Sequence, residues 1–265
     1  MSLSVTAQTD ASVARIRRSV IEAVIFDLDG VVTDTAELHA QAWAQLFDSY
    51  LASRPLRPGE DHSPFTPADY AEFVDGKPRH AGVADFLTAR GITVSMGAAG
   101  DGTDQETVYG LGRRKDELFL ALLASAQVTA YPSTVGLVGM LQRAGLKTGL
   151  FSASRNCRTV LHAAGLGSLF PVTVDGVTAV QLGLKGKPDP AVLLETAERL
   201  GCPAARTSVV EDSAAGVIAA RRGGFGLIIG IDRSGSNERL RHAGADVVVS
   251  DAAYIRVESE ETSNG

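Results

Sequence analysis

The feature that most constrains this chain is a short apolar segment, residues 24–26, which leads into two aspartates one residue apart, Asp27 and Asp29. Because alternate side chains of a β-strand point the same way, both carboxylates should project from one face where the strand meets its loop. Gly30 then allows a sharp turn. The two charges repel each other unless a cation shares them, and such an oxygen-rich pair suits Mg²⁺. The ordinary alternative is a strand followed by an acidic turn, since Asp and Gly are common turn residues.

The composition favours a folded globular protein of one or two domains, because 45% of the 265 residues are hydrophobic and no long biased tract interrupts them. The formal net charge of -6 provides no general basic field for nucleic acid or for an anionic membrane. We therefore expect neither nucleic acid nor a membrane as a partner.

The N-terminal segment and the cysteines bear on the cellular compartment. The segment 1–22 is polar and lacks the continuous apolar stretch of a secretory signal, and no later segment is long and apolar enough to span a bilayer. Cys157 and Cys202 are isolated in the sequence, so we expect buried thiols rather than a zinc site or a disulfide scaffold. These features predict a cytoplasmic protein.

Apolar, β-rich segments recur along the chain with helical patterns between them. After the first strand they lie near residues 146–151, 207–210, 226–231 and 247–249. This alternation predicts an α/β fold with a doubly wound parallel sheet covered by helices on both faces. Ligands of such sheets bind at the carboxyl ends of the strands. Asp27, Ser152 and the pair Glu211 and Asp212 should therefore meet at one edge of the sheet.

A stretch of different character, residues 38–125, separates the first strand from the rest of the sheet. Helical patterns at 38–51, 67–74, 83–88 and 113–124 predict an inserted helical domain. Its Pro-rich passage 54–67 and Gly-rich passage 97–112 are expected to be mobile connections. The other predicted units are an N-terminal extension at 1–20, a core domain formed by 21–37 and 126–251, and a frayed polar C-terminal tail at 252–265.

Two further segments carry groups that suit a phosphate. The strand near 146–151 runs into Ser152, Ser154 and Asn156; hydroxyls and backbone N–H groups at a helix start can bind phosphate, although Ser and Asn also cap helices. Lys187 precedes Asp189 and Pro190, which suit the start of a helix. A lysine fixed there could neutralise a transferring phosphoryl group, whereas a lone lysine is usually solvated.

The four segments, in this order, resemble the haloacid dehalogenase superfamily of phosphotransferases, and the resemblance spans residues 23–250. It implies a Rossmann-like core in which Asp27 is the nucleophile that forms an aspartyl phosphate and Asp29 is the general acid and base. It also implies that the phosphoryl group is bound by Ser152, Ala153 and Lys187. The implied Mg²⁺ ligands are Asp27, the backbone carbonyl of Asp29, Glu211 and Asp212. The presence of Asp29 weighs against a dehalogenase, because dehalogenases of the superfamily lack this aspartate.

The inserted domain resembles the cap of the β-phosphoglucomutase-like family. Asp34 is predicted to cap a helix that begins near Thr35, with Glu37 three residues after the cap. Every fourth residue from there would face the pocket, and these residues are Thr35, His39 and Trp43. A surface or capping histidine and a cap-core tryptophan are the alternatives.

Further matches to that family lie in the insertion and after the second strand. The segment 75–79 resembles the family's cap loop, in which a glycine and an arginine contact substrate, here Gly76 and Arg79. Lys115 matches the second cap cation, although the long Gly-rich stretch before it could shift that alignment by a residue or two. Ser154 and Asn156 also agree with the family pattern.

The resemblance implies conversion of β-glucose 1-phosphate into glucose 6-phosphate through β-glucose 1,6-bisphosphate, and this mutase is the preferred interpretation. A sugar-phosphate phosphatase with water as the acceptor is the alternative, and a non-catalytic phosphosugar sensor is a more remote one. The expected partner is a small phosphorylated sugar. The expected oligomeric state is a monomer, with a dimer as the alternative.

Overall fold

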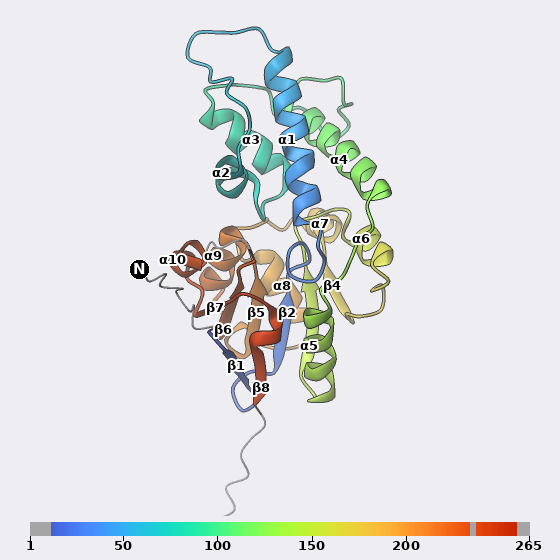
Figure 1. Ribbon diagram of the computed structural model, residues 1–265, viewed down its shortest axis with the longest axis vertical. Coiled ribbons are helices and arrows are strands. Elements are labelled where there is room, and N and C mark those ends of the chain that lie inside the picture. Colours follow the sequence, from blue (N-terminus) through green and yellow to red (C-terminus); the bar gives the residue numbers. More distant parts are fainter. Residues whose placement is uncertain (1–11, 234–236, 259–265) are drawn as a thin grey trace, which may run out of the picture.

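The computed structural model describes residues 12–233 and 237–258. Its centre is a parallel sheet of six strands in the order β4-β3-β2-β5-β6-β7 (Figure 1). The strands are β2 (Ala23–Phe26), β3 (Lys147–Phe151), β4 (Val172–Val174), β5 (Thr207–Glu211), β6 (Leu227–Ile231) and β7 (Val247–Val249). The predicted α/β fold with a doubly wound parallel sheet is confirmed. The sequence pattern did not predict β4, which has only three residues and lies at the edge of the sheet.

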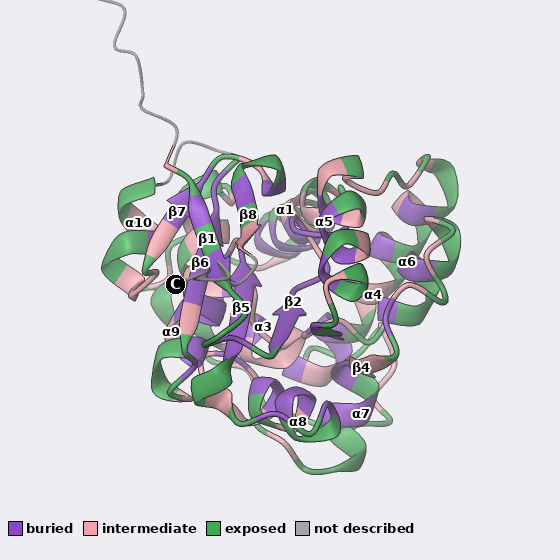
Figure 2. Cartoon of the chain, turned by 90° about the horizontal axis from the view of Figure 1, so that it is seen from below, coloured by how far each residue is buried: buried purple, intermediate pink, exposed green. Residues whose placement is uncertain are grey.

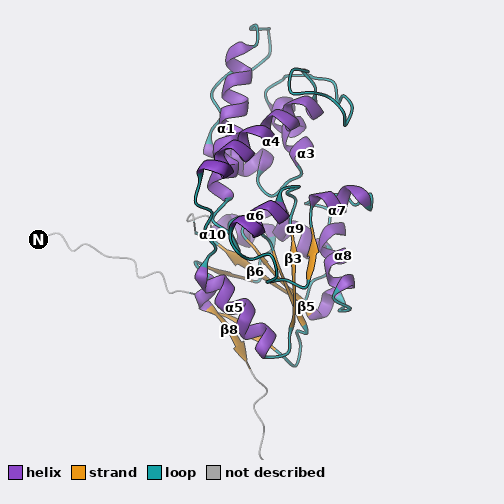
Figure 3. Cartoon of the chain, turned by 90° about the vertical axis from the view of Figure 1, so that its right-hand side faces the viewer, coloured by secondary structure: helices purple, strands orange, loops and turns teal. Residues whose placement is uncertain are grey.

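Helices cover both faces of this sheet (Figure 3). Alternation along β2 explains why: Val24 and Phe26 face one hydrophobic cluster, while Ala23 and Ile25 face the other. The first cluster receives α5 (Pro132–Arg143) and α6 (Cys157–Ala163). The second receives α7 (Gly176–Gln181), α8 (Ala191–Arg199), α9 (Ala214–Arg222) and α10 (Asn237–Ala243). Figure 2 shows β2 and β5 as buried, and each large apolar side chain buried there contributes about 1.5–3 kcal/mol.

The register of the central strands brings distant residues level with one another. Phe26 pairs with Leu150 on one side and with Val210 on the other. The next residue of each strand, among them Asp27 and Glu211, therefore reaches the same carboxyl edge. Ser152 follows directly after β3 at this edge.

The inserted helices lie beyond that edge, at one end of the molecule (Figures 1 and 3). They are α1 (Ala36–Ser53), α2 (Pro67–Asp69) with the π-helical turn η1 (Tyr70–Val74), α3 (Arg79–Ala89) and α4 (Val108–Ser125). We call residues 38–125 the cap and propose that they form a separate domain. The cap has a hydrophobic cluster of its own, in which Phe47 packs on Phe86 with ring centroids 4.0 Å apart.

The two passages of the cap expected to be mobile connections are partly structured. Helix α4 begins at Val108 and not near residue 113, so Gly110 and Gly112 lie inside it. A Cβ atom on Gly110 would lie 2.2 Å from the backbone oxygen of Gln105, and this close approach requires a glycine. In the Pro-rich passage, Glu60 forms an ion pair with Arg54 at 2.8 Å and anchors this part of the loop to the end of α1.

The predicted polar tail is wrong for residues 252–258. They form a 3₁₀ turn, η3 (Ala252–Tyr254), and then β8 (Ile255–Glu258), which pairs in parallel with β1 (Ala14–Arg17). The apolar residues Ile16 and Ile255 alternate with arginines and are fully buried, and this short alternation is the signal that was missed. The rest of the tail, 259–265, and residues 1–11 of the extension lie outside the described residues.

Two sequence expectations can be compared with the described part of the chain. Across 12–233 and 237–258, each helix is too short or too polar to cross a lipid bilayer. Cys157 and Cys202 are free and buried, as predicted. Burial raises the pKa of the Cys157 thiol.

Candidate active site

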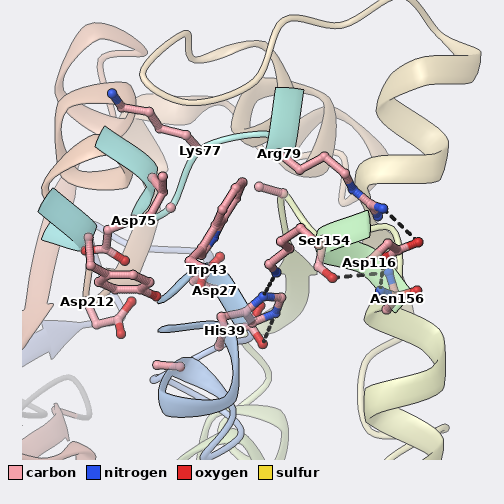
Figure 4. A pocket seen from close by; sticks show the side chains of 17 residues that line it. Asp27, His39, Trp43, Asp75, Lys77, Arg79, Asp116, Ser154, Asn156 and Asp212 are labelled. Atoms are coloured by element: carbon pink, nitrogen blue, oxygen red, sulfur yellow. Dashed lines mark hydrogen bonds and ion pairs between the residues drawn. The ribbon is translucent and has the colours of Figure 1, made fainter. Parts of the chain in front are cut away.

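A cavity of about 70 Å³ lies between the cap and the carboxyl edge of the sheet (Figure 4). Most of the predicted site residues line it: Asp27, Asp29, His39, Trp43, Gly76, Arg79, Lys115, Ala153, Ser154, Asn156 and Asp212. The other predicted residues stand behind this lining and bond to it or to one another: Thr35, Ser152, Lys187 and Glu211. The structure therefore brings together residues up to 185 positions apart in the sequence, from Asp27 to Asp212.

Lys187 is buried between two carboxylates at the floor of the site. Its Nζ donates to Asp27 Oδ1 and to Glu211 Oε2, each at 2.8 Å. Burial lowers the pKa of Lys187, but the charges of Asp27 and Glu211 outweigh this effect and raise it above its ordinary value. Burial also raises the pKa of Asp27, helped by the charge of Glu211 and opposed by that of Lys187. The solvated lysine expected of a lone surface residue is thus excluded.

Three carboxylates form a group that suits a divalent cation. Asp27, Glu211 and Asp212 each present an oxygen within 4.8 Å of the others. Burial and the charge of Glu211 raise the pKa of Asp212 well above its ordinary value, so a cation placed there would relieve repulsion. Oxygen donors of this kind fit Mg²⁺. Asp29, whose backbone carbonyl is the ligand that the resemblance implies, directs its carboxylate toward the cap and outside this group.

The carboxylate of Asp29 is held by groups from the first turn of α1. Thr35 Oγ1 donates to Asp29 Oδ1, and His39 Nε2 lies 3.4 Å from the same oxygen. Burial raises the pKa of Asp29, but His39, Thr35 and the charge of Lys115 outweigh it and bring the pKa below its ordinary value. The lowered pKa keeps Asp29 as a carboxylate at neutral pH.

The start of α1 differs from the predicted capping arrangement. Thr35 is the N-cap residue, and its hydroxyl bonds to Asp29 instead of capping the helix. The carboxylate of Asp34 accepts a hydrogen bond from Tyr131 at 2.9 Å. The predicted helix start near Thr35 is confirmed, whereas the proposed cap by Asp34 is wrong.

His39 and Lys115 form a buried pair above Asp29. Lys115 Nζ lies 2.6 Å from His39 Nδ1, so a protonated Lys115 donates to that nitrogen and leaves the histidine proton on Nε2, directed toward Asp29. The imidazole stacks on Phe119 with centroids 4.0 Å apart, which excludes the surface-histidine alternative. Burial and the charge of Lys115 lower the pKa of His39, which favours this neutral form.

Trp43 belongs to the hydrophobic cluster of the cap and also lines the cavity, so its role toward a substrate stays a prediction. Its ring packs on Phe47 in this cluster, with centroids 5.2 Å apart. Lys115 Nζ lies 5.1 Å from the centroid of Trp43 and 4.9 Å from that of Phe119. Aromatic faces thus stabilise a buried cation that has no carboxylate within ion-pair distance among the described residues.

Lys115 should make the stability of the ligand-free protein depend on pH. Burial and the charge of Arg79 lower its pKa from 10.5 to about 7. The native state therefore binds fewer protons than the unfolded state between these values, and stability should rise with pH across this window. We expect the wild type to gain stability relative to Lys115→Met between pH 7 and pH 10, measured by urea unfolding of both proteins. A constant difference over this range would show that Lys115 keeps an ordinary pKa.

A second bonded group in the cavity lining contains Arg79. Arg79 pairs with Asp116 at 2.7 Å, and Asn156 Nδ2 donates to the same side chain at 2.7 Å (Figure 4). Asp116 thus connects α3 and α4 of the cap to the start of α6 in the core. Asn156 occupies the N-cap position of α6 but makes no side-chain capping bond, so its contact with the cap replaces the simple capping role.

The loop after β3 is organised by its own hydroxyls. The backbone N–H of Ser154 donates to Ser152 Oγ at 3.0 Å, and that of Asn156 donates to Ser154 Oγ at 3.1 Å. Ser152 is buried, while Ala153 and Ser154 line the cavity. The loop is therefore preformed beside Asp27.

Several lining residues were not predicted from the sequence, and the charged or hydroxylic ones are Tyr70, Asp75, Lys77 and Asp116. Burial and the charge of Glu211 raise the pKa of Asp75 to about 6. Asp75 and Lys77 belong to the cap-loop segment already singled out, and Asp116 follows Lys115, so neighbouring positions were the available signal. Tyr70 had no such signal.

Comparison with known proteins shows the family of this chain. Residues 21–224 match the haloacid dehalogenase-like hydrolase family. The chain belongs to this family. The predicted resemblance to the haloacid dehalogenase superfamily is confirmed, and so is the prediction of an enzyme.

Two relatives named as β-phosphoglucomutases are similar to this chain over most of its length. The chain is 43% identical over 239 residues to a β-phosphoglucomutase of Mycobacterium bovis, covering 89% of this chain and 91% of that protein. A solved β-phosphoglucomutase of Clostridium difficile shares 25% identity and a TM-score of 0.68, over 88% of this chain and 92% of that one.

Another relative is much longer than this chain. An uncharacterized glycosyl hydrolase of Mycobacterium tuberculosis is 44% identical over 238 residues, which cover 90% of this chain but only 18% of that protein. The chain therefore corresponds to a small part of that relative.

Proposed function

We propose that the chain is a Mg²⁺-dependent phosphotransferase that acts through an aspartyl phosphate, and that its reaction is that of a β-phosphoglucomutase. The observation that carries this proposal is the presence of cations from both domains at one cavity, with the core lysine directly behind the lining and two cations of the cap in it. Lys187 contacts Asp27 in the core, while Arg79 and Lys115 line the cavity from the cap. A sugar bisphosphate needs such a site at each end, and the similarity to a protein named β-phosphoglucomutase supports the same function.

The core residues suit the transfer of a phosphoryl group to a carboxylate. Asp27 would attack the phosphorus atom, and the bond from phosphorus to the sugar oxygen would break. Lys187 would stabilise the charge on the equatorial oxygens, and backbone N–H groups near Ser152 and Ala153 would orient them. Mg²⁺ held by Asp27, the Asp29 carbonyl, Glu211 and Asp212 would supply further charge stabilisation.

Asp29 suits the proton transfers on either side of this step. Its lowered pKa makes it a carboxylate in the free protein, so it can accept the proton of a sugar hydroxyl that attacks the phosphoaspartate. When Asp27 then takes the other phosphoryl group from the bisphosphate, Asp29 can give this proton to the sugar oxygen that leaves. Thr35 and His39 would hold the carboxylate in place during both events.

The size of the cavity indicates that substrate entry requires movement of the cap. Its volume of about 70 Å³ is small beside the roughly 300–1,000 Å³ of typical ligand pockets. A closed cap excludes water from the phosphoaspartate and so favours transfer to sugar over hydrolysis.

A sugar-phosphate phosphatase is the second candidate, because the matching family is described as hydrolases and Asp29 could equally activate water. Purified protein with Mg²⁺, β-glucose 1-phosphate and a trace of glucose 1,6-bisphosphate tests both. Glucose 6-phosphate in large excess over inorganic phosphate would support the mutase. Phosphate release without isomerisation would support the phosphatase, and no turnover or phosphoenzyme across a panel of sugar phosphates would favour a non-catalytic sensor.

Arg79→Ala should impair the mutase cycle more than the hydrolysis of a simple phosphate ester, because only the bisphosphate has a second phosphate for Arg79 to bind. Loss of a charge-assisted hydrogen bond pair costs about 1.5–3 kcal/mol, or roughly 10- to 100-fold in kcat/KM. Parallel kinetics on both substrates measure the difference. Arg113→Ala removes an exposed cation of the same helical cap and serves as the control. Equal losses on both substrates would contradict the role of Arg79.

A further inference from the structure

The cap loop contacts the core at two points where only a glycine fits. A Cβ atom on Gly76 of the loop would lie 2.2 Å from Ser213 Oγ in the core. Conversely, a Cβ atom on Gly186 of the core would lie 2.1 Å from Pro78 Cγ and 2.8 Å from Pro78 Cδ. Both distances are well below van der Waals contact. The loop therefore rests directly on the core at both glycines.

Each contact is adjacent in sequence to a charged group of the site. Pro78 precedes Arg79, and Gly186 precedes Lys187. One contact thus joins the backbone that carries the cap arginine to the backbone that carries the core lysine. At the other contact, Ser213 follows Asp212, a member of the carboxylate group.

We propose that Pro78, seated on Gly186, is the positioning contact that sets the separation between Arg79 and Lys187 when the cap is closed. This inference rests on the proposed function, because a bisphosphate must be gripped at both ends at once. A misplacement of reacting groups by about 1 Å can cost on the order of 100-fold in rate. A rigid contact that fixes the distance between the two cations would therefore increase the rate of the mutase reaction.

At Gly186, the contact with Pro78 can be tested without straining the backbone. Gly186 is not among the glycines with positive φ, so alanine is compatible with its backbone. All three of the atoms nearest to an added Cβ belong to Pro78. By contrast, Gly76 has a φ of 69°, and a substitution there would combine backbone strain with the clash.

The test is a double-mutant cycle of Gly186→Ala and Pro78→Ala. We expect Gly186→Ala to lower the mutase kcat/KM by about tenfold or more, with a smaller effect on hydrolysis of a simple phosphate ester. Pro78→Ala removes Cγ and Cδ and leaves only Cβ, 3.5 Å from the new methyl group. The double variant should therefore recover to the activity of Pro78→Ala alone, which itself should show a modest loss on the mutase reaction.

The control is Gly167→Ala, because nothing lies within 4 Å of a Cβ atom at Gly167. Full mutase activity in Gly186→Ala would overturn the proposal, and so would a double variant no more active than Gly186→Ala. If Gly186→Ala failed to fold, the Pro78→Ala variant alone decides, and unchanged mutase kinetics there would overturn the proposal. If the wild type hydrolyses sugar phosphates without isomerising them, the proposed function fails and the inference fails with it. A wild type that isomerises while Gly186→Ala keeps full mutase activity would overturn the inference alone.

Discussion

Replacing Asp27 with asparagine should abolish the phosphoenzyme and reduce turnover by about 10⁴-fold or more. Asparagine has the same shape and keeps an oxygen that can accept the hydrogen bond from Lys187. It cannot form an acyl phosphate, because the amide lacks a nucleophilic carboxylate oxygen. Intact-protein mass spectrometry after exposure to a small phosphoryl donor and Mg²⁺ would detect the added phosphate in the wild type and its absence in the variant.

Asp34→Asn is the matched control for this substitution. Asp34 lies in the same loop but is exposed, and its carboxylate accepts a hydrogen bond from Tyr131, which asparagine can also accept. The control should retain normal turnover and phosphoenzyme. Normal turnover in the Asp27 variant would remove the central assignment, whatever the remaining residues do.

The core of the site could be predicted because its residues follow strands. Asp27, Ser152 and Glu211 each stand where an apolar segment ends, and a parallel sheet delivers such positions to one edge. The fold class follows from the same alternation of segments. Register then fixes the finer placement, since pairing of Phe26 with Leu150 and Val210 sets the three ends level.

The cap was less predictable because its contacts depend on tertiary placement. Nothing in the sequence states that Asp116 meets both Arg79 and Asn156, which come from a different helix and a different domain. The start of α4 was misplaced because two glycines suggested a loop, while close packing on the backbone of Gln105 is what requires Gly110. The pairing of β1 with β8 joins segments over 230 residues apart, too distant for local patterns to reveal.

The cap cations are held by groups that a ligand would have to replace or share. Arg79 is paired with Asp116, and Lys115 is bonded to Nδ1 of His39, the ring nitrogen that carries no proton. A second phosphate that enters the cavity therefore competes with one carboxylate for Arg79 but meets little competition at Lys115. Asp116, which also accepts a hydrogen bond from Asn156, keeps Arg79 aligned in the ligand-free protein.

Lys187→Met should remove both activity and a large part of the stability of the metal-free protein. Lys187 is the shared partner of Asp27 and Glu211, all three are buried, and removal of one partner leaves uncompensated buried charge. Such losses cost about 3–5 kcal/mol in free energy of unfolding. Urea unfolding in the presence of a chelator at pH 7 would measure the deficit relative to the wild type.

The same substitution should respond to Mg²⁺ and to pH in a way that a packing defect would not. Without the lysine, the pKa of Asp27, already raised by burial, should rise further, so native carboxylates bind protons that unfolded ones do not. Stability lost at neutral pH should therefore return in part as the pH falls toward 5, and millimolar Mg²⁺ should restore it at pH 7 by replacing the missing positive charge. Lys185→Met, an exposed lysine two residues earlier, should show none of these effects. A deficit independent of both Mg²⁺ and pH would mean that Lys187 stabilises the protein by packing and not by its charge.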